Sequence, residues 1–259
     1  MGIEEKKIGG NKETILSFIK KYNRVAPVEI AVTFNLTPVE VKEYLDKLQC
    51  LQKIVSNKGE RKMIKEKFTA ENSAMLLIDH QVGTMGWVRS TTFEEMKMNA
   101  LVLAKSAKVL DLPVVLTSSM EEYAQGPLLE ELKEILPREF DARVKRVGVV
   151  NAMDDENFAT AVKNTGRKKI IIAGVTHDVC VVYPAITAVS QGYDVQVVVD
   201  AGGSPTTIAD ETALRRMEQS GVILTSTNQL IAELAGSWAT EKGGKLVQIL
   251  MEDVFSKIK

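Results

Sequence analysis

Cys180 is the residue whose type and position point most directly to chemistry. It follows the apolar run Ile170–Ala173 and falls in the first turn of a predicted helix over residues 178–191. Unpaired N–H groups and a positive partial charge at a helix start favour thiolate over thiol, so we expect an activated nucleophile. A buried structural cysteine is the alternative, because free cysteines are among the most buried residues.

Two other segments supply groups that could assist the thiol. Asp79 ends the apolar run Ala74–Ile78 and could accept the thiol proton. Lys145 and Arg146 are adjacent in the run Val144–Val150, and adjacent side chains on a strand point to opposite faces. Only one of them can reach a site, and at this point either Lys145 or Arg146 could be that residue.

A rival arrangement uses the histidine close to the thiol. His177 and Cys180 would form a nucleophile–base pair, with Asp178 orienting the imidazole. The short separation of the two residues in a turn disfavours this geometry. We therefore expect His177, together with Trp87 after the first strand, to line a substrate pocket.

Apolar runs alternate with helical patterns over the last three quarters of the chain. The runs lie at 74–78, 113–116, 144–150, 170–173, 195–199 and 222–224, and the helical patterns at 91–110, 127–136, 154–165, 178–191 and 207–220. Continuous apolar strands between helices are typical of an α/β protein with a doubly wound parallel sheet covered on both faces, a Rossmann-like three-layer fold. Such sheets bind ligands beyond the carboxyl ends of the strands, where Asp79, one of the two adjacent cations and Cys180 would meet.

Composition excludes several classes of protein. The chain has 33 Lys+Arg against 34 Asp+Glu, and its net charge of −1 excludes a uniformly basic nucleic-acid coat protein. No apolar run approaches the ~20 residues of a membrane span. Two cysteines and two histidines exclude a disulfide framework and a His-rich metal cluster. We expect a cytoplasmic protein with no metal or other cofactor and no membrane partner.

Residues 1–67 differ from residues 68–259 in net charge and in the pattern of predicted elements, and we predict a domain boundary between them. The first part carries a net charge of +5 and the second −6. Three short helical patterns precede a ribbon at residues 53–65, and the third begins with Thr37 as N-cap and Glu40 closing a capping box. This order is similar to a winged helix-turn-helix domain.

A winged helix suggests two roles for the first part. The expected recognition helix, residues 38–49, has a net charge of −1 on its exposed positions, a poor surface for phosphates. We therefore favour interaction or regulation over DNA binding. The alternative is a DNA-binding transcriptional regulator whose second domain, residues 68–259, senses a metabolite.

The segment from about Ser73 to Trp238 resembles the isochorismatase-like cysteine hydrolases. The likeness rests on LLIDHQ around Asp79, on RVGVVNAMDDENF at 146–158 and on AGVTHDVCVVYPAITAVSQGYDV at 173–195. It is closest to the branch without a metal site, whose members often form rings or octamers. The stretch Thr117–Gly126 lacks the histidine of the metal-dependent nicotinamidases, and true isochorismatases typically lack the cysteine.

The resemblance implies a catalytic triad of Asp79, Arg146 and Cys180. It also implies a cis peptide at Val175–Thr176, with the Thr176 N–H directed into an oxyanion hole. The implied activity is hydrolysis of an amide-type C–N bond in a small molecule through a thioester. The implied assembly is a homo-oligomer.

Overall fold

The computed structural model describes residues 36–37, 39–42 and 67–257. The chain divides into two units, Met1–Glu66 and Lys67–Lys259. In the first unit, the Thr37 N–H donates to Glu40 Oε2 over 2.8 Å and the Glu40 N–H donates to Thr37 Oγ1 over 3.3 Å, which confirms the predicted capping box. The rest of the predicted winged helix lies outside the described residues, and the two-domain assignment stays a prediction.

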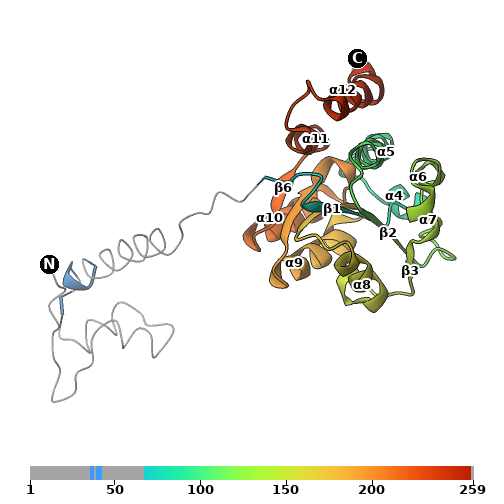
Figure 1. The fold of residues 1–259 in the computed structure, drawn as a ribbon. Helices are drawn as coiled ribbons and strands as arrows, with labels where there is room; N and C mark the ends of the chain where they lie inside the picture. Colours follow the sequence, from blue (N-terminus) through green and yellow to red (C-terminus); the bar gives the residue numbers. More distant parts are fainter. Residues whose placement is uncertain (1–35, 38, 43–66, 258–259) are drawn as a thin grey trace. The chain divides into compact units, whose positions relative to one another are not determined.

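Residues 67–257 build one parallel sheet of six strands (Figure 1). The strands are β1 (Ser73–Ile78), β2 (Val114–Ser119), β3 (Val144–Arg146), β4 (Lys169–Gly174), β5 (Asp194–Val198) and β6 (Ile223–Thr225). Their order, β3-β2-β1-β4-β5-β6, confirms the predicted doubly wound sheet. In this order the winding reverses between β1 and β4, where such folds place their ligand.

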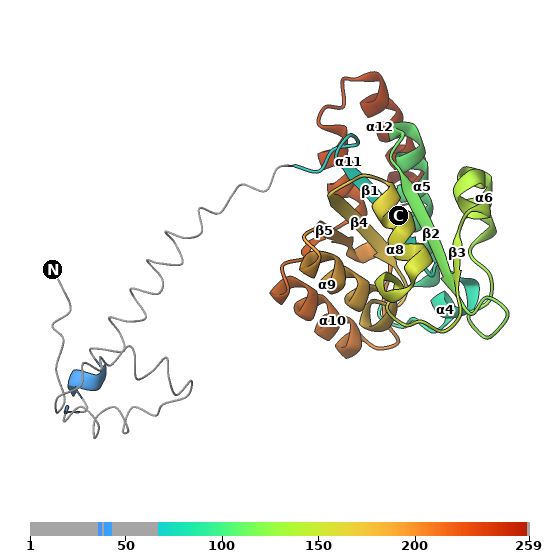
Figure 2. The same ribbon diagram turned by 60° about the horizontal axis from the view of Figure 1, so that its bottom comes forward.

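Helices cover both faces of the sheet (Figures 1 and 2). One face carries α5 (Phe93–Leu110), α11 (Thr227–Ala235) and α12 (Glu241–Asp253), and the other carries α8 (Glu156–Asn164), α9 (Val182–Ser190) and α10 (Thr207–Gln219). The shorter elements are α4 (Val82–Gly86), α6 (Glu130–Ile135), α7 (Pro137–Asp141), the 3-10 turns Ala152–Asp154, Val199–Ala201 and Phe255–Lys257, and a π-helix, His177–Val181. In the described residues, no helix is long and apolar enough to cross a membrane.

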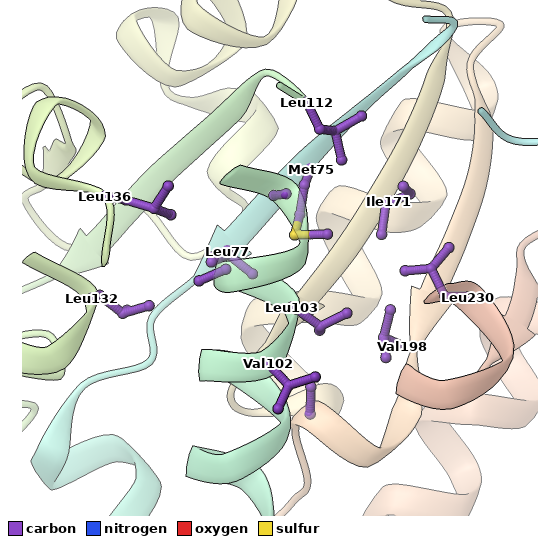
Figure 3. Close-up of a cluster of buried hydrophobic side chains, with 14 of the residues drawn as sticks. Met75, Leu77, Val102, Leu103, Leu112, Leu132, Leu136, Ile171, Val198 and Leu230 are labelled. Carbon is purple, nitrogen blue, oxygen red and sulfur yellow. The ribbon is translucent and has the colours of Figure 1, made fainter. Parts of the chain in front are cut away.

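The two faces hold separate apolar cores that share the strands. Met75 and Leu77 of β1 pack with Leu103 of α5 on one side (Figure 3). Leu76 of β1 packs with Phe158 of α8 on the other side. Because both faces of β1 are buried, its sequence is a continuous apolar run rather than an alternating one.

The sequence misplaced some elements at the edge where the site lies. β3 ends at Arg146, although the apolar run continues to Val150, and Gly148 adopts a φ of +83°. The helix predicted from residue 178 begins instead as the π-helix His177–Val181. The five-residue helices α4 and α7 were not predicted, because so few residues show no helical periodicity.

Candidate active site

A pocket of about 450 Å³ lies at the carboxyl edge of the sheet. Asp79 follows β1, Arg146 ends β3, and Thr176 and Cys180 follow β4, and all four residues line the pocket. The parallel strands bring their ends to one edge, so segments far apart in the sequence meet there. The structure therefore brings the three expected catalytic residues together.

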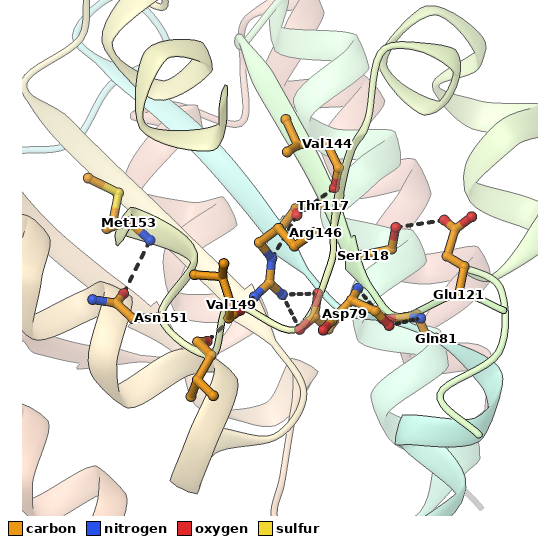
Figure 4. A network of polar contacts seen from close by, with 12 residues as sticks. Asp79, Gln81, Thr117, Ser118, Glu121, Val144, Arg146, Val149, Asn151 and Met153 are labelled. Atoms are coloured by element: carbon orange, nitrogen blue, oxygen red, sulfur yellow. Dashed lines mark hydrogen bonds and ion pairs between the residues drawn. The ribbon is translucent and has the colours of Figure 1, made fainter. Parts of the chain in front are cut away.

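A buried ion pair joins Asp79 to Arg146 (Figure 4). Arg146 Nη2 lies 2.5 Å from Asp79 Oδ1 and also contacts Oδ2, and each side chain is only 1% exposed. Arg146 Nε donates to Thr117 Oγ1 over 3.1 Å, and Nη1 donates to the Val149 carbonyl over 2.6 Å. These bonds fix the guanidinium, so the orientation of the carboxylate is fixed with it.

Lys145 lies on the opposite side of β3 from Arg146. Its Nζ is 2.9 Å from Glu121 Oε2, and its side chain is 56% exposed. Burial alone would raise the pKa of the Glu121 carboxyl. Hydrogen bonds from Arg143, Ser118 and Lys145 outweigh burial and lower this pKa to about 2. Of the two adjacent cations, only Arg146 lines the pocket.

The backbone turns sharply at Asp79. Its φ is +56°, a left-handed conformation that is uncommon outside glycine. The Asp79 N–H donates to the Thr117 carbonyl over 3.0 Å, which holds this turn against β2. Residues held in such conformations cluster at functional sites, and Met120, another pocket residue, shares the feature with a φ of +51°.

The turn after β4 presents Thr176 and Cys180 to the pocket. The Val175–Thr176 peptide is cis, as the resemblance implied. The Val175 N–H donates to the Ile78 carbonyl over 3.0 Å, so the turn after β4 is tied to the end of β1. Gly174 allows this approach, because a Cβ there would lie 2.6 Å from the Ile78 carbonyl oxygen. The π-helix that follows is a rare element found frequently at functional sites.

Cys180 is protonated at rest, contrary to our expectation. Burial raises the pKa of the Cys180 thiol to about 12, and the charge of Asp79 beside it adds to the rise. The sequence argument rested on the helix start and did not include burial of the thiol or the charge of Asp79, both of which raise the pKa. Helix-start activation of the thiol is therefore a wrong prediction.

Asp79 is placed to take the thiol proton. The Cys180 thiol donates a hydrogen bond to the Asp79 carboxylate. Burial raises the pKa of Asp79, whereas the charge and hydrogen bonds of Arg146 lower it. A carboxylate with a raised pKa is a stronger base, which suits proton abstraction from a thiol.

The resemblance implied an oxyanion hole with the Thr176 N–H as a donor, and the backbone N–H of Cys180 lies in the same turn. The Cys180 N–H donates to the Thr176 carbonyl over 2.9 Å, so this donor is already used. The Thr176 N–H donates to the Cys180 sulfur. This hydrogen bond lowers the thiol pKa, but burial and Asp79 raise it by more. Thr176 thus presents its N–H at the nucleophile, whereas Val175 is fully buried.

The predicted place of His177 is wrong. The residue is fully buried and does not line the pocket. Its Nδ1 lies 2.9 Å from Asp210 Oδ1, and a Cβ on Gly202 would lie 2.4 Å from its Nε2. The sequence did not predict this contact, because Asp210 lies in α10, far from His177 along the chain. His177 packs behind the turn, so it cannot act as a base in the pocket, and Asp178 does not orient it.

Trp87 lines the pocket as predicted, and it is 45% exposed. The sequence argument missed several other lining residues, including Thr84, Ser119, Met120 and Gln125. Ser119 ends β2, so the rule that placed Asp79 at a strand end applies to it as well. Thr84 lies in the unpredicted helix α4 and carried no signal.

In residues 36–37, 39–42 and 67–257, no group of three or more His, Cys, Asp or Glu side chains is arranged to hold a metal ion. The polar side chains at the end of β3 bind one another or backbone carbonyls instead (Figure 4).

The isochorismatase domain model matches residues 73–229. The chain belongs to the isochorismatase family. Probable hydrolase YcaC of Escherichia coli is 40% identical over 173 residues, which cover 67% of this chain and 82% of the relative. The chain is accordingly an isochorismatase-family hydrolase, and this family fold confirms the one expected from the resemblance.

Two solved structures are similar to this chain within the same family. YcaC from Pseudomonas aeruginosa, solved with hexane-2,5-diol and covalent acrylamide, has a TM-score of 0.71 and 37% identity, covering 75% of this chain and 95% of that one. The Escherichia coli YcaC protein, described as an octameric hydrolase of unknown specificity, has a TM-score of 0.68 and 37% identity, covering 73% and 92%.

Proposed function

We propose that this hydrolase cleaves the C–N bond of a small amide with Cys180 as nucleophile and Asp79 as proton acceptor. The observation that carries the proposal is the hydrogen bond from the buried Cys180 thiol to the Asp79 carboxylate, inside a pocket of about 450 Å³. A thiol needs a base when its own pKa is well above neutral pH, and Asp79 is the base beside it.

The first half of the cycle forms a thioester. The thiol proton moves to Asp79 as the sulfur attacks the amide carbonyl carbon. The developing oxyanion accepts a hydrogen bond from the Thr176 N–H. The C–N bond then breaks, and the leaving amine takes the proton from Asp79.

The second half regenerates the enzyme. Asp79 takes a proton from water as the water oxygen attacks the thioester carbonyl. The C–S bond breaks, a carboxylic acid leaves, and the sulfur recovers the proton from Asp79. Arg146 keeps its bonds to Thr117 and Val149 throughout and stabilises the ionised form of Asp79 between transfers.

The Pseudomonas aeruginosa relative supports a reactive nucleophile in this fold. That protein was solved with covalent acrylamide, and acrylamide is an electrophile that alkylates thiols. Cys180 is the free cysteine of the described residues in this chain, and it lines the pocket. Acrylamide is therefore also a suitable probe here.

Ammonia release from a panel of small primary amides tests the proposal. We expect turnover by the wild type, none by Cys180→Ala, and unchanged turnover by Cys50→Ala, which alters the other cysteine of the chain. Rapid quenching and mass spectrometry should detect an acyl adduct on the peptide that contains Cys180. Turnover by Cys180→Ala would contradict the proposed nucleophile.

We also propose that the chain forms a homo-oligomer. The octameric Escherichia coli relative supports this, as do exposed apolar side chains of this chain, among them Val147 at 86% and Ile208 at 70% exposure. Light scattering on the full chain should give a mass of several protomers. A strictly monomeric mass would contradict the proposal.

A further inference from the structure

Two polar atoms in the pocket lining are buried without a partner. Among the residues that the structure describes, Thr84 Oγ1 and Asp178 Oδ1 make no hydrogen bond and have almost no accessible surface. Both residues line the pocket that holds Cys180. A buried polar atom without a partner costs free energy, so a native site that keeps two of them calls for a bound group that satisfies them.

The Thr84 hydroxyl is the more enclosed of the two. Thr84 is 4% exposed, in the short helix α4 that follows Asp79. Its backbone N–H donates to the Gln125 carbonyl, which holds α4 in place. The unpaired hydroxyl therefore has a fixed position in the pocket wall.

Asp178 carries the charge that the pocket does not neutralise. Asp79 and Arg146 pair with each other and cancel. Asp178 also borders a neighbouring hollow that contains Arg216, yet in residues 67–257 no cation lies within ion-pair distance of its carboxylate. The pocket lining thus has a net negative charge and an acceptor that lacks a donor.

The remaining wall between these groups is largely apolar. Trp87, Met120, Val150, Val179 and Pro205 all line the pocket. Such a surface accommodates the short methylene chain of a ligand and offers no partner to a carboxylate on that ligand. The pocket volume of about 450 Å³ accommodates a small amide of this kind.

We propose that the substrate is a short aliphatic primary amide with a hydrogen-bond donor at its far end, an ammonium above all. The amide carbonyl lies at Cys180, the ammonium binds Asp178, and the Thr84 hydroxyl accepts a further hydrogen bond. Amides of short ω-amino acids have this chemistry. The inference rests on the proposed amide hydrolysis and adds the substrate class.

Binding to Cys180→Ala protein, measured by calorimetry, separates recognition from turnover. The ligands are 4-aminobutanamide, its uncharged analogue pentanamide, and the carboxylate succinamate. We expect 4-aminobutanamide to bind about 10- to 100-fold more tightly than pentanamide, as for a hydrogen bond to a charged group. Succinamate should bind more weakly than both.

Second substitutions, made in the Cys180→Ala protein, show which residues cause the preference for 4-aminobutanamide over pentanamide. Asp178→Asn should reduce the ratio of the two dissociation constants to about threefold or less, and Thr84→Val should reduce it partially. Asp154→Asn removes one exposed carboxylate outside the pocket lining, so this matched control should leave the ratio unchanged. Circular dichroism and thermal melting confirm that each variant is folded.

The outcomes distinguish the two proposals. Equal affinities for 4-aminobutanamide and pentanamide, no detectable binding of either, or an unchanged ratio in Asp178→Asn would overturn the assignment of Asp178 and Thr84, because water would then satisfy them. Tight binding without ammonia release by the wild type would contradict amide hydrolysis instead.

Discussion

Two cation–carboxylate pairs lie at opposite edges of the same sheet, and one of them lies in the pocket that contains Cys180. Asp79 and Arg146 pair at the carboxyl ends of β1 and β3, each side chain 1% exposed. Lys169 and Asp194 pair at the start of β4 and β5, with Nζ 3.2 Å from Oδ2 and Asp194 37% exposed. The cation of the second pair lies over the Phe68 ring at 5.2 Å.

The difference between the pairs is what lies beside them. Cys180 donates a hydrogen bond to Asp79, whereas an aromatic ring packs on Lys169. Both pairs therefore have a buried cation, but only Asp79 of the first pair also contacts a cysteine thiol that lines the pocket. The comparison teaches that a buried ion pair indicates function only where a third, reactive group touches it.

The largest expected effect is on catalysis. Asp79→Asn should lower kcat/KM for amide hydrolysis about 10²- to 10⁴-fold, because a general base is lost while the shape is kept. Asp194→Asn should leave kcat/KM within about twofold, since that pair is remote from the thiol. Steady-state kinetics on both variants checks the contrast, and similar losses in the two would break it.

Stability should separate the pairs next. Arg146→Met leaves a buried carboxylate without its cation, and we expect a loss of about 3–5 kcal/mol in the free energy of unfolding. Lys169→Met leaves a carboxylate that water can reach, and we expect a loss of about 1 kcal/mol. Urea unfolding of the two variants measures both values. Equal losses would show that exposure of the carboxylate does not matter.

The pH dependence of kcat/KM should sharpen the role of Asp79. Asp79 must be ionised to accept a proton, so activity falls as pH falls through its pKa. Burial raises that pKa, which puts the acid limb above the ordinary Asp value of 3.8. The thiol pKa of about 12 predicts no loss from thiol ionisation in the neutral range. An acid limb at or below 3.8 would contradict a raised pKa.

The sequence predicted which residues meet at the pocket, for physical reasons. Asp79 and Cys180 follow buried apolar runs, and parallel strands bring their carboxyl ends together. The pleat of β3 separates Lys145 from Arg146, and the structure places only Arg146 in the pocket. These features depend on local pattern and on one topological rule.

The features that the sequence did not predict depend on contacts between distant segments. His177 is paired with Asp210 of α10, so its burial was not visible locally. The direction of the Cys180 pKa shift depends on burial and on Asp79, which is about a hundred residues away in the chain. Thr84 lies in a five-residue helix that periodicity cannot detect.

The alkylation rate of Cys180 by acrylamide tests the central claim most directly. Wild type and Asp79→Asn are compared at neutral pH by mass spectrometry, with Cys180→Ala showing any labelling of Cys50. Removing the charge of Asp79 lowers the thiol pKa and would by itself speed labelling. If Asp79 accepts the thiol proton, the variant should instead react about 100-fold more slowly. Labelling as fast as in the wild type, or faster, would contradict the role of Asp79 as the base.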